Sequence, residues 1–280
     1  MERRRTGRLA AARSLAAAYL DNSRGAIPRA SDMDAAEQWA LRQQMAWRAK
    51  IVNGSLHLKL LTAASRWAER SSVARLLLLA LQHRSPPLPD LDVIYVHNDR
   101  DISPDHGQLP LVLTNAHAHG HSSLPVPDFS WLGWYTHTPP WCELARQLRA
   151  AAEARPWARR IDRAVFRGSL SNGKPRKRLK TLLASSADAR QHLDVRHVRP
   201  TFLKGSTRPS SDVPSPLVEA CNYKYALSVP GYGYANRLKS LLQCGAVVIH
   251  VAAPWNEFFF PMLGARRYTG RVGCPCRCIR

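Results

Sequence analysis

Glycine and arginine residues cluster between residues 225 and 251, where their spacing could hold an anion. A strand-like run ends in Gly231-Tyr232-Gly233-Tyr234, and a helix-like run then opens with Ala235-Asn236-Arg237. Glycines let the backbone approach a ligand closely, helix N-terminal amides favour negative charge, and Arg237 adds a planar fork of donors. The pattern predicts a phosphate-binding turn in a βαβ unit. The alternative is a plain glycine turn between strand and helix.

A second basic strand end lies earlier in the chain, at Phe166-Arg167-Gly168-Ser169. A basic helix start, residues 174–178, follows it and contains Arg176. Ligands of open α/β sheets bind at the carboxyl ends of the strands. Two strand ends that carry Arg and Gly on one parallel sheet could therefore share one diphosphate. The alternative is a solvated basic helix face, which suits Lys177.

An acidic turn follows the most strand-like run of the first half. Residues 92–98 are largely β-branched or aromatic, and Asn98-Asp99-Arg100-Asp101 comes at their end. A carboxylate at a strand end is a candidate general base. Two alternatives stay open: a plain turn, in which Asn and Asp are favoured, and a metal-binding D-x-D motif. Asp32-Met33-Asp34 shares the D-x-D pattern but is better explained as the first turn of a helix capped by Ser31.

Three alternating histidines could meet a metal only if they lay on a strand. His117, His119 and His121 would then share one face. Gly120 and the serines that follow favour a loop instead, and no carboxylate or cysteine partner is evident. The pattern therefore predicts no metal site.

The six cysteines predict neither a metal site nor a disulfide framework. Three of them form a C-x-C-x-C run at 274–278, which lacks a second ligand pair. The others are scattered at Cys142, Cys221 and Cys244, and six is a low count for a disulfide scaffold of this length.

Two features bear on the secretory pathway. Asn53-Gly54-Ser55 fits an N-glycosylation acceptor if the chain enters that pathway. Residues 1–30 are rich in Arg and Ala, and no signal peptide is evident because Arg13 interrupts the apolar run. An organelle-targeting segment, an amphipathic helix and a truncated beginning all fit this start.

The first half of the chain predicts two long helices followed by strands. The first helix begins at Ser31 and runs through Trp39, Met45 and Trp47. The second covers 56–82, where apolar residues recur at threes and fours. The other expected elements are strands at 92–98 and 110–115, an irregular stretch at 120–140 and a helix at 142–154.

Strands and helices alternate in the second half, and this alternation predicts a parallel sheet in an α/β fold. Gly245 is expected to end the last helix in the left-handed conformation. The expected strands are 164–168, 193–198, 224–231 and 246–251, the helices are 175–186 and 235–245, and 201–217 is a loop.

The charge of the chain points to an anionic partner. The 280 residues carry a net charge of +21, of which +17 falls on residues 141–280. A nucleotide, a polyanion, an acidic surface or a nucleic acid would meet such a charge, although part of it could reflect arginine-rich composition alone. No run approaches the ~18 apolar residues that a membrane span needs, so we expect no transmembrane helix.

Three segments of the chain together resemble glycosyltransferase family 90, which includes Rumi-type protein O-glucosyltransferases and fungal capsule-associated xylosyltransferases. They are FRGS at 166–169, CNYKYALSVPGYGYANRLKSLLQCGAVVIHV at 221–251 and WNEFFFPML at 255–263. The resemblance extends over about 92–268. It implies a GT-B architecture, in which two Rossmann-like domains face each other across a cleft.

The resemblance also implies a division of the chain. We expect a basic segment at 1–30, an acceptor-side domain at 31–155, a donor domain at 160–268 and an atypical cysteine-rich tail at 269–280. The family continues beyond Tyr268 with further strands and helices, so we expect the donor domain to be incomplete.

An inverting transfer of glucose or xylose follows from the same resemblance. The donor would be a UDP-sugar, the acceptor a hydroxyl of a protein or glycan, and no metal would be needed. Asp101 stands in the family's N-x-R-D turn and matches the catalytic base, and Arg178 is the fallback for Arg176 because the loop length differs. The positions that match donor-binding residues are Ser169, Arg176, Tyr232, Gly233, Tyr234, Ala235, Asn236 and Arg237.

Two other functions stay open from the residues. A relative that binds a nucleotide or a polyanion without catalysis would keep the same basic surface. A nucleic-acid-binding protein would use the net charge, but no recognised nucleic-acid module is present, so we expect no nucleic-acid partner. The resemblance further implies the lumen of the endoplasmic reticulum or Golgi.

Overall fold

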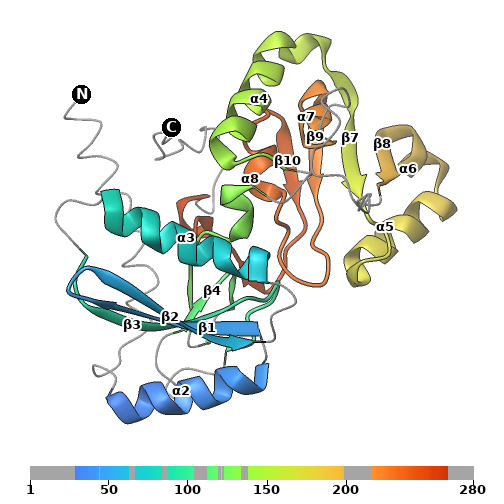
Figure 1. Cartoon of the computed structure of the whole chain (residues 1–280). Coiled ribbons are helices and arrows are strands. Elements are labelled where there is room, and N and C mark those ends of the chain that lie inside the picture. The colour runs from blue at the N-terminus through green and yellow to red at the C-terminus, as the bar shows by residue number, and fades with distance from the viewer. Residues whose placement is uncertain are drawn as a thin grey trace, which may run out of the picture. The chain divides into compact units, whose positions relative to one another are not determined.

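The structure, a computed structural model, describes residues 29–43, 45–62, 67–83, 88–103, 112–118, 121, 123–133, 138–198 and 216–263. They form two compact units (Figure 1). The first holds the described residues up to Phe129 and those from Pro254 onward, and the second holds Ser130–Ala253. None of the helices in these ranges combines the length and the apolar character that a membrane crossing requires. The N-terminal segment 1–28 and the cysteine-rich tail lie outside the described residues.

The first unit is built on a mixed five-stranded sheet of order β2-β1-β3-β4-β6. β1 is antiparallel to β2 and β3, whereas β3, β4 and β6 are parallel to one another. A short antiparallel pair, β5 and β11, joins it. The elements are α2 (Ala30–Gln43), β1 (Met45–Val52), β2 (Ser55–Thr62), α3 (Trp67–His83), β3 (Leu91–Val96), β4 (Val112–Thr114), β5 (His117–Ala118), β6 (Ser123–Pro125), β11 (Trp255–Asn256) and the 3₁₀ helix η5 (Phe260–Leu263).

Helices α2 and α3 cover opposite faces of this sheet (Figure 1). Alternate residues of β3 point to opposite faces of the sheet, and both sets of residues include buried apolar side chains. Ile94 packs with Met33 and Ala36 of α2, while Tyr95 packs with Val73 of α3. The sheet is therefore covered by helices on both faces, and the turn that follows β3 starts from this buried layer.

Two helix predictions for the first half are wrong in part. The first helix ends at Gln43, and Met45 and Trp47 lie in β1; the second begins at Trp67, because residues 55–62 form β2. Asn53 and Gly54 have φ of 49° and 75°, so this Asn-Gly pair makes the two-residue turn of a hairpin.

The first turn of α2 also differs from the expected cap. Ser31 lies inside the helix rather than at its cap, and Asp32 accepts a hydrogen bond from the N–H of Arg29 at 2.7 Å. The strands expected at 92–98 and 110–115 are confirmed as β3 and β4, but the stretch expected to be irregular contains β6.

The second unit carries a fully parallel four-stranded sheet of order β10-β9-β7-β8, as the alternating pattern predicts. The parallel α/β character is thus confirmed, while the GT-B placement of two domains stays a prediction. Its elements are α4 (Trp141–Ala154), β7 (Ile161–Gly168), α5 (Gly173–Ser185), α6 (Ala187–His192), β8 (Leu193–His197), α7 (Pro216–Glu219), β9 (Tyr223–Ser228), α8 (Leu238–Leu241) and β10 (Val247–His250), with the 3₁₀ helices η2 (Phe129–Leu132), η3 (Trp157–Arg159) and η4 (Ala220–Asn222).

Alternate residues of β7 face two different apolar layers. Val165 packs with Leu144 of α4 and Leu241 of α8, whereas Phe166 packs with Leu179 of α5. Helix α4 therefore belongs to the second unit, although the expected division at 155 would separate it from β7. The segment from Pro254, expected in the donor domain, pairs instead with β5.

The helix expected at 235–245 is much shorter than predicted. Only Leu238–Leu241 is α-helical, and the residues on either side form turns. Gly245 has φ of 61°, so its left-handed conformation is confirmed, but it ends a run of turns four residues beyond the end of the helix. A helix of four residues has little dipole, so any anion held here depends mainly on side chains and single backbone amides.

Candidate functional site

The carboxyl ends of β7 and β9 lie side by side in the parallel sheet. Ala164 and Val165 are in register with Tyr225 and Ala226, so both strands run out at the same edge. The loop after β7 leads to α5, and the loop after β9 leads to α8. This is the sheet edge at which ligands of open α/β folds bind.

Two guanidinium groups converge on one aromatic ring at this edge. The Cζ atoms of Arg237 and Arg176 lie 4.4 and 5.6 Å from the ring centroid of Phe166. Arg176 donates from Nε to the carbonyl oxygen of Val229 at 3.1 Å, and Arg237 donates from Nη1 to the carbonyl oxygen of Arg167. Cation–π contact and carbonyl bonds thus hold both groups in place.

Three glycines leave room for this convergence. A Cβ on Gly168 would lie 2.5 Å from Nη2 of Arg237, and one on Gly231 would lie 3.3 Å from Cζ of Arg176. Gly173 begins α5 with φ of 75°, and a Cβ there would overlap the carbonyl oxygen of Gly231. The glycines therefore permit close approach of side chains and of backbone.

Arg237 is half-buried and lies beside a second cation, Arg176. Burial, and secondarily the charge of Arg176, lower the pKa of Arg237 to about 9. No carboxylate of the described residues forms an ion pair with Arg237. Burying a cation beside another cation is costly unless an anion joins them. A diphosphate, with its negative charge and acceptor oxygens, suits this pair.

Arg167, which the sequence pattern also offered as an anion ligand, has a different role. Its Nη2 donates to Asp194 at 2.9 Å and to Glu219 at 2.7 Å, and the guanidinium is almost completely buried. Burial alone would raise the pKa of Asp194, but hydrogen bonds from Arg167 and Tyr223 outweigh it and lower that pKa to about 2. Arg167 therefore cross-links β7, β8 and α7 and is not available to a ligand.

The remaining residues expected to bind the donor differ in their exposure and contacts. Tyr232 is exposed, whereas Gly233, Tyr234 and Ala235 are buried. Asn236 donates to the hydroxyl oxygen of Ser130 at 3.2 Å. The hydroxyl of Ser169 hydrogen-bonds to Asn172 Oδ1 at 3.2 Å, at the start of α5. The structure thus brings Ser169, Arg176 and Arg237 to one sheet edge, while the contacts of the buried loop residues are structural.

Asp101 lies in the first unit, shortly after β3, and its side chain is completely buried. Oδ1 accepts hydrogen bonds from the N–H of Ser103 at 3.0 Å and from its hydroxyl at 2.5 Å. Oδ2 accepts from the N–H of Ala118 at 2.8 Å and from the hydroxyl of Ser123 at 2.5 Å. Four donors thus occupy the carboxylate, and a hydroxyl would have to swing away before Asp101 could accept another proton.

Two histidines surround this carboxylate. His117 Nδ1 lies 2.8 Å from the hydroxyl oxygen of Ser123 and 3.8 Å from Asp101. His121 Nδ1 lies 3.9 Å from Asp101 and 2.6 Å from the carbonyl oxygen of Ser103. His119 is outside the described residues. Among the residues that the structure does describe, no group of three or more His, Cys, Asp or Glu side chains could hold a metal ion.

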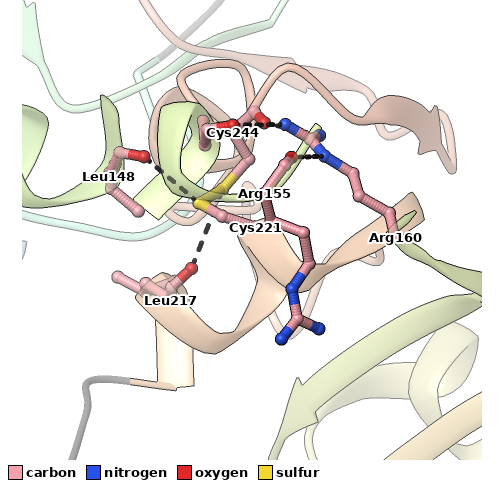
Figure 2. The surroundings of a disulfide bond; sticks show 7 residues. Leu148, Arg155, Arg160, Leu217, Cys221 and Cys244 are labelled. Carbon is pink, nitrogen blue, oxygen red and sulfur yellow. Dashed lines mark hydrogen bonds between the residues drawn. A yellow bond between two sulfur atoms is a disulfide. The ribbon is translucent and has the colours of Figure 1, made fainter. Parts of the chain in front are cut away.

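A disulfide that the sequence pattern did not predict supports the Arg237 loop. Cys221 and Cys244 are bonded to each other (Figure 2). In the sequence they flank β9, the glycine turn and α8. Arg160 donates to the carbonyl oxygens of Cys244 at 2.8 Å and of Arg155 at 3.1 Å beside it (Figure 2). The bridge closes the segment that carries Arg237, so it limits the freedom of the loop.

Comparison with known proteins decides the family. The model of glycosyl transferase family 90 matches residues 29–269. The chain belongs to glycosyl transferase family 90. It is 26% identical over 196 residues to O-glucosyltransferase rumi of Drosophila pseudoobscura pseudoobscura, which covers 63% of this chain and 45% of that protein. It is 32% identical over 120 residues to Protein O-glucosyltransferase 1 of Rattus norvegicus, covering 41% and 29%.

A further O-glucosyltransferase also matches this chain. Protein O-glucosyltransferase 1 of Homo sapiens is 29% identical over 137 residues, which is 48% of this chain and 34% of that protein. The chain spans about half the length, or less, of the curated relatives it matches. The predicted Rumi-type resemblance is confirmed at the level of the family.

Proposed function

We propose that this chain is an inverting glycosyltransferase that moves glucose or xylose from a UDP-sugar to a hydroxyl of a protein or glycan. The family supports transfer of a sugar, and the names of the relatives support an O-linked product. The observation that carries the proposal is the convergence of Arg176 and Arg237 on Phe166. Two adjacent cations at the carboxyl edge of a parallel sheet suit the diphosphate of a nucleotide sugar.

The leaving group explains why arginines would serve in place of a metal. UDP departs as an anion, and its developing charge must be neutralised as the bond to the sugar breaks. Arg176 and Arg237 offer fixed donors for this purpose, and Ser169 adds a hydroxyl at the same edge. Tyr232, whose ring is exposed, offers a flat apolar face to the nucleoside.

Asp101 is the proposed general base. In a single displacement the acceptor oxygen attacks the anomeric carbon opposite the diphosphate, the bond to UDP breaks, and the hydroxyl proton passes to Asp101. The hydroxyl of Ser123 now occupies Oδ2, and its rotation would free an acceptor position there. Ser103 and Ala118 would still hold the carboxylate in its orientation.

The burial of Asp101 supports a second candidate, a non-catalytic relative that binds a nucleotide or polyanion. Such a protein would keep Arg176 and Arg237 in use while the carboxylate stays satisfied by its four donors. It would bind UDP without turning over a UDP-sugar. A polyanion in the same place would bind with a steep dependence on salt, because each phosphate contact releases counterions.

Thermal unfolding with nucleotides tests the proposal. We expect UDP, UDP-glucose or UDP-xylose to stabilise the chain by about 2.7 kcal/mol at a hundredfold excess over Kd. GDP and ADP should stabilise it less, and UDP-sugar with an acceptor should release UDP. Equal stabilisation by all diphosphates would refute a UDP-specific site, and selective UDP binding without release would favour the non-catalytic candidate.

We also propose that the protein resides in the lumen of the endoplasmic reticulum or Golgi. The buried disulfide between Cys221 and Cys244 supports this location, because such bonds persist mainly in oxidising compartments. Alkylation of thiols before and after reduction, on protein taken from the cell, would test it.

A further inference from the structure

The triplet Asn53-Gly54-Ser55 lies at the tip of the hairpin formed by β1 and β2. Val52 pairs with Ser55, so Asn53 and Gly54 are the two turn residues. Both have positive φ, which is the conformation that an Asn-Gly turn between twisted strands favours. It is the only Asn-x-Ser or Asn-x-Thr triplet among the 280 residues.

The side chain of Asn53 is free to carry a substituent. Asn53, Gly54 and Ser55 are all exposed. The backbone N–H of Asn53 donates to Asp90 Oδ1 at 2.9 Å, and no described residue forms a hydrogen bond with its side-chain amide. A Cβ placed on Gly54 would meet nothing within 4 Å. A large group on the Asn53 amide would therefore displace no native contact.

The compartment implied by the disulfide is also the compartment in which asparagine is glycosylated. Cys221 and Cys244 are bonded in the core of the second unit, so the chain folds where thiols are oxidised. This argument uses neither Asp101 nor the arginines of the sheet edge, so it stands independently of the proposed transfer reaction.

We propose that Asn53 is an N-glycosylation site of this protein. The donor is a lipid-linked oligosaccharide diphosphate, and a membrane-bound oligosaccharyltransferase performs the transfer. The amide nitrogen of Asn53 forms a bond to C1 of the first sugar while the bond from C1 to the phosphate oxygen breaks. The lipid diphosphate leaves, and a base of the transferase takes the amide proton.

The order in which the strands are made leaves time for this transfer. We expect the oligosaccharide to be added while the hairpin is still open. A two-stranded hairpin alone is only marginally stable. The second strand to pair with β1 is β3, which starts at Leu91, 38 residues after Asn53. At roughly 5–20 residues per second, synthesis of this stretch takes about 2–8 s.

The test is expression of the full chain behind a cleavable secretory leader in a eukaryotic host. Total leader-cleaved protein is treated with peptide N-glycosidase in heavy-oxygen water and then analysed by intact mass and peptide mass. We expect a loss of mass and a heavy-oxygen aspartate at position 53. Spontaneous deamidation of the Asn-Gly pair before treatment would leave the aspartate unlabelled.

Matched variants separate the sequon from its surroundings. Asn53→Gln and Ser55→Ala should abolish the mass loss, whereas Ser55→Thr should retain it. Asn172, which also precedes a glycine but has Lys174 two residues on, should stay unlabelled. Transfer precedes folding, so occupancy can be read even in a variant that misfolds. Wild-type protein that is leader-cleaved and unmodified at Asn53, or modification that persists in Ser55→Ala, would overturn the proposal.

Discussion

Replacement of Arg237 by methionine should separate ligand binding from folding. Methionine keeps an apolar chain over the ring of Phe166, which lies 4.4 Å from the guanidinium carbon, but removes the charge beside Arg176. A hydrogen bond to a charged group contributes about 1.5–3 kcal/mol. Its loss should weaken UDP binding by roughly 10- to 150-fold, since 1.4 kcal/mol is a factor of ten.

The unliganded protein should respond in the opposite direction. Burial and the neighbouring Arg176 both lower the pKa of Arg237, which means that the folded protein disfavours this charge. Arg237→Met should therefore unfold at the same temperature as the wild type or at a higher one. A structural arginine, such as one paired with carboxylates, would instead lower the unfolding temperature when it is replaced.

Isothermal titration of UDP and thermal unfolding without ligand measure these two effects. Lys177→Ala is the matched control, because Lys177 is an exposed cation one residue from Arg176 on α5. It should change UDP affinity by less than about twofold, as expected for an exposed charge. Wild-type UDP affinity in a folded Arg237→Met protein would refute the diphosphate site, and equal losses in both variants would indicate only diffuse charge attraction.

Three further predictions concern the disulfide, the buried carboxylate of the first unit and the carboxylate beside Arg167. Cys221→Ser should lower the free energy of unfolding by about 3.5 kcal/mol, because it opens a loop of 23 residues, whereas Cys142→Ser, which breaks no disulfide, should lower it clearly less. Asp101→Asn should preserve UDP affinity and reduce UDP release by about 10²–10⁴-fold, with Asp99→Asn much milder; a requirement for Asp99 and manganese would favour the metal-binding alternative. The pKa of Asp194 is lowered to about 2 in the folded state, from a value near 3.8 in the unfolded chain. The ionised carboxylate therefore stabilises the folded protein by about 2 kcal/mol above pH 3.8, and this stabilisation is lost as the pH falls through 2. Asp194→Asn should flatten the acid limb of the pH–stability curve, and an unchanged limb would contradict the assignment.

The sequence predicted the second unit better than the first, and the reason lies in how the apolar residues repeat. Strands β7, β9 and β10 are short apolar runs separated by helices and glycines, so their number and parallel direction follow from the pattern. In the first unit, β1 alternates while β2 carries Leu58, Leu60 and Leu61 in a run that also fits helical spacing. The Asn53-Gly54 turn between them was the signal that should have decided for a hairpin.

The parts of the candidate site that could not be predicted depend on contacts between distant residues. Asp101 is held by Ala118 and Ser123, 17 and 22 residues further along the chain, and no local pattern foretells those bonds. The disulfide closes over 23 residues without any motif that marks the pairing. Arg167 and Arg237 carry the same charge at the same sheet edge, and only their neighbours in space distinguish them.

The environment of a buried or half-buried arginine indicates whether it serves the fold or a ligand. Arg48 and Arg167 are each paired with two or more carboxylates, and so their charges are neutralised within the chain. Arg160 has no carboxylate partner among the described residues, but three carbonyl oxygens accept its N–H groups, two of them at the C-terminal end of α4, where the helix dipole favours a cation. Arg237 donates to one carbonyl oxygen in the described chain and lies beside the cation Arg176. Its remaining donors and its charge are the ones that an added anion would satisfy, and this is why its replacement should cost affinity and not stability.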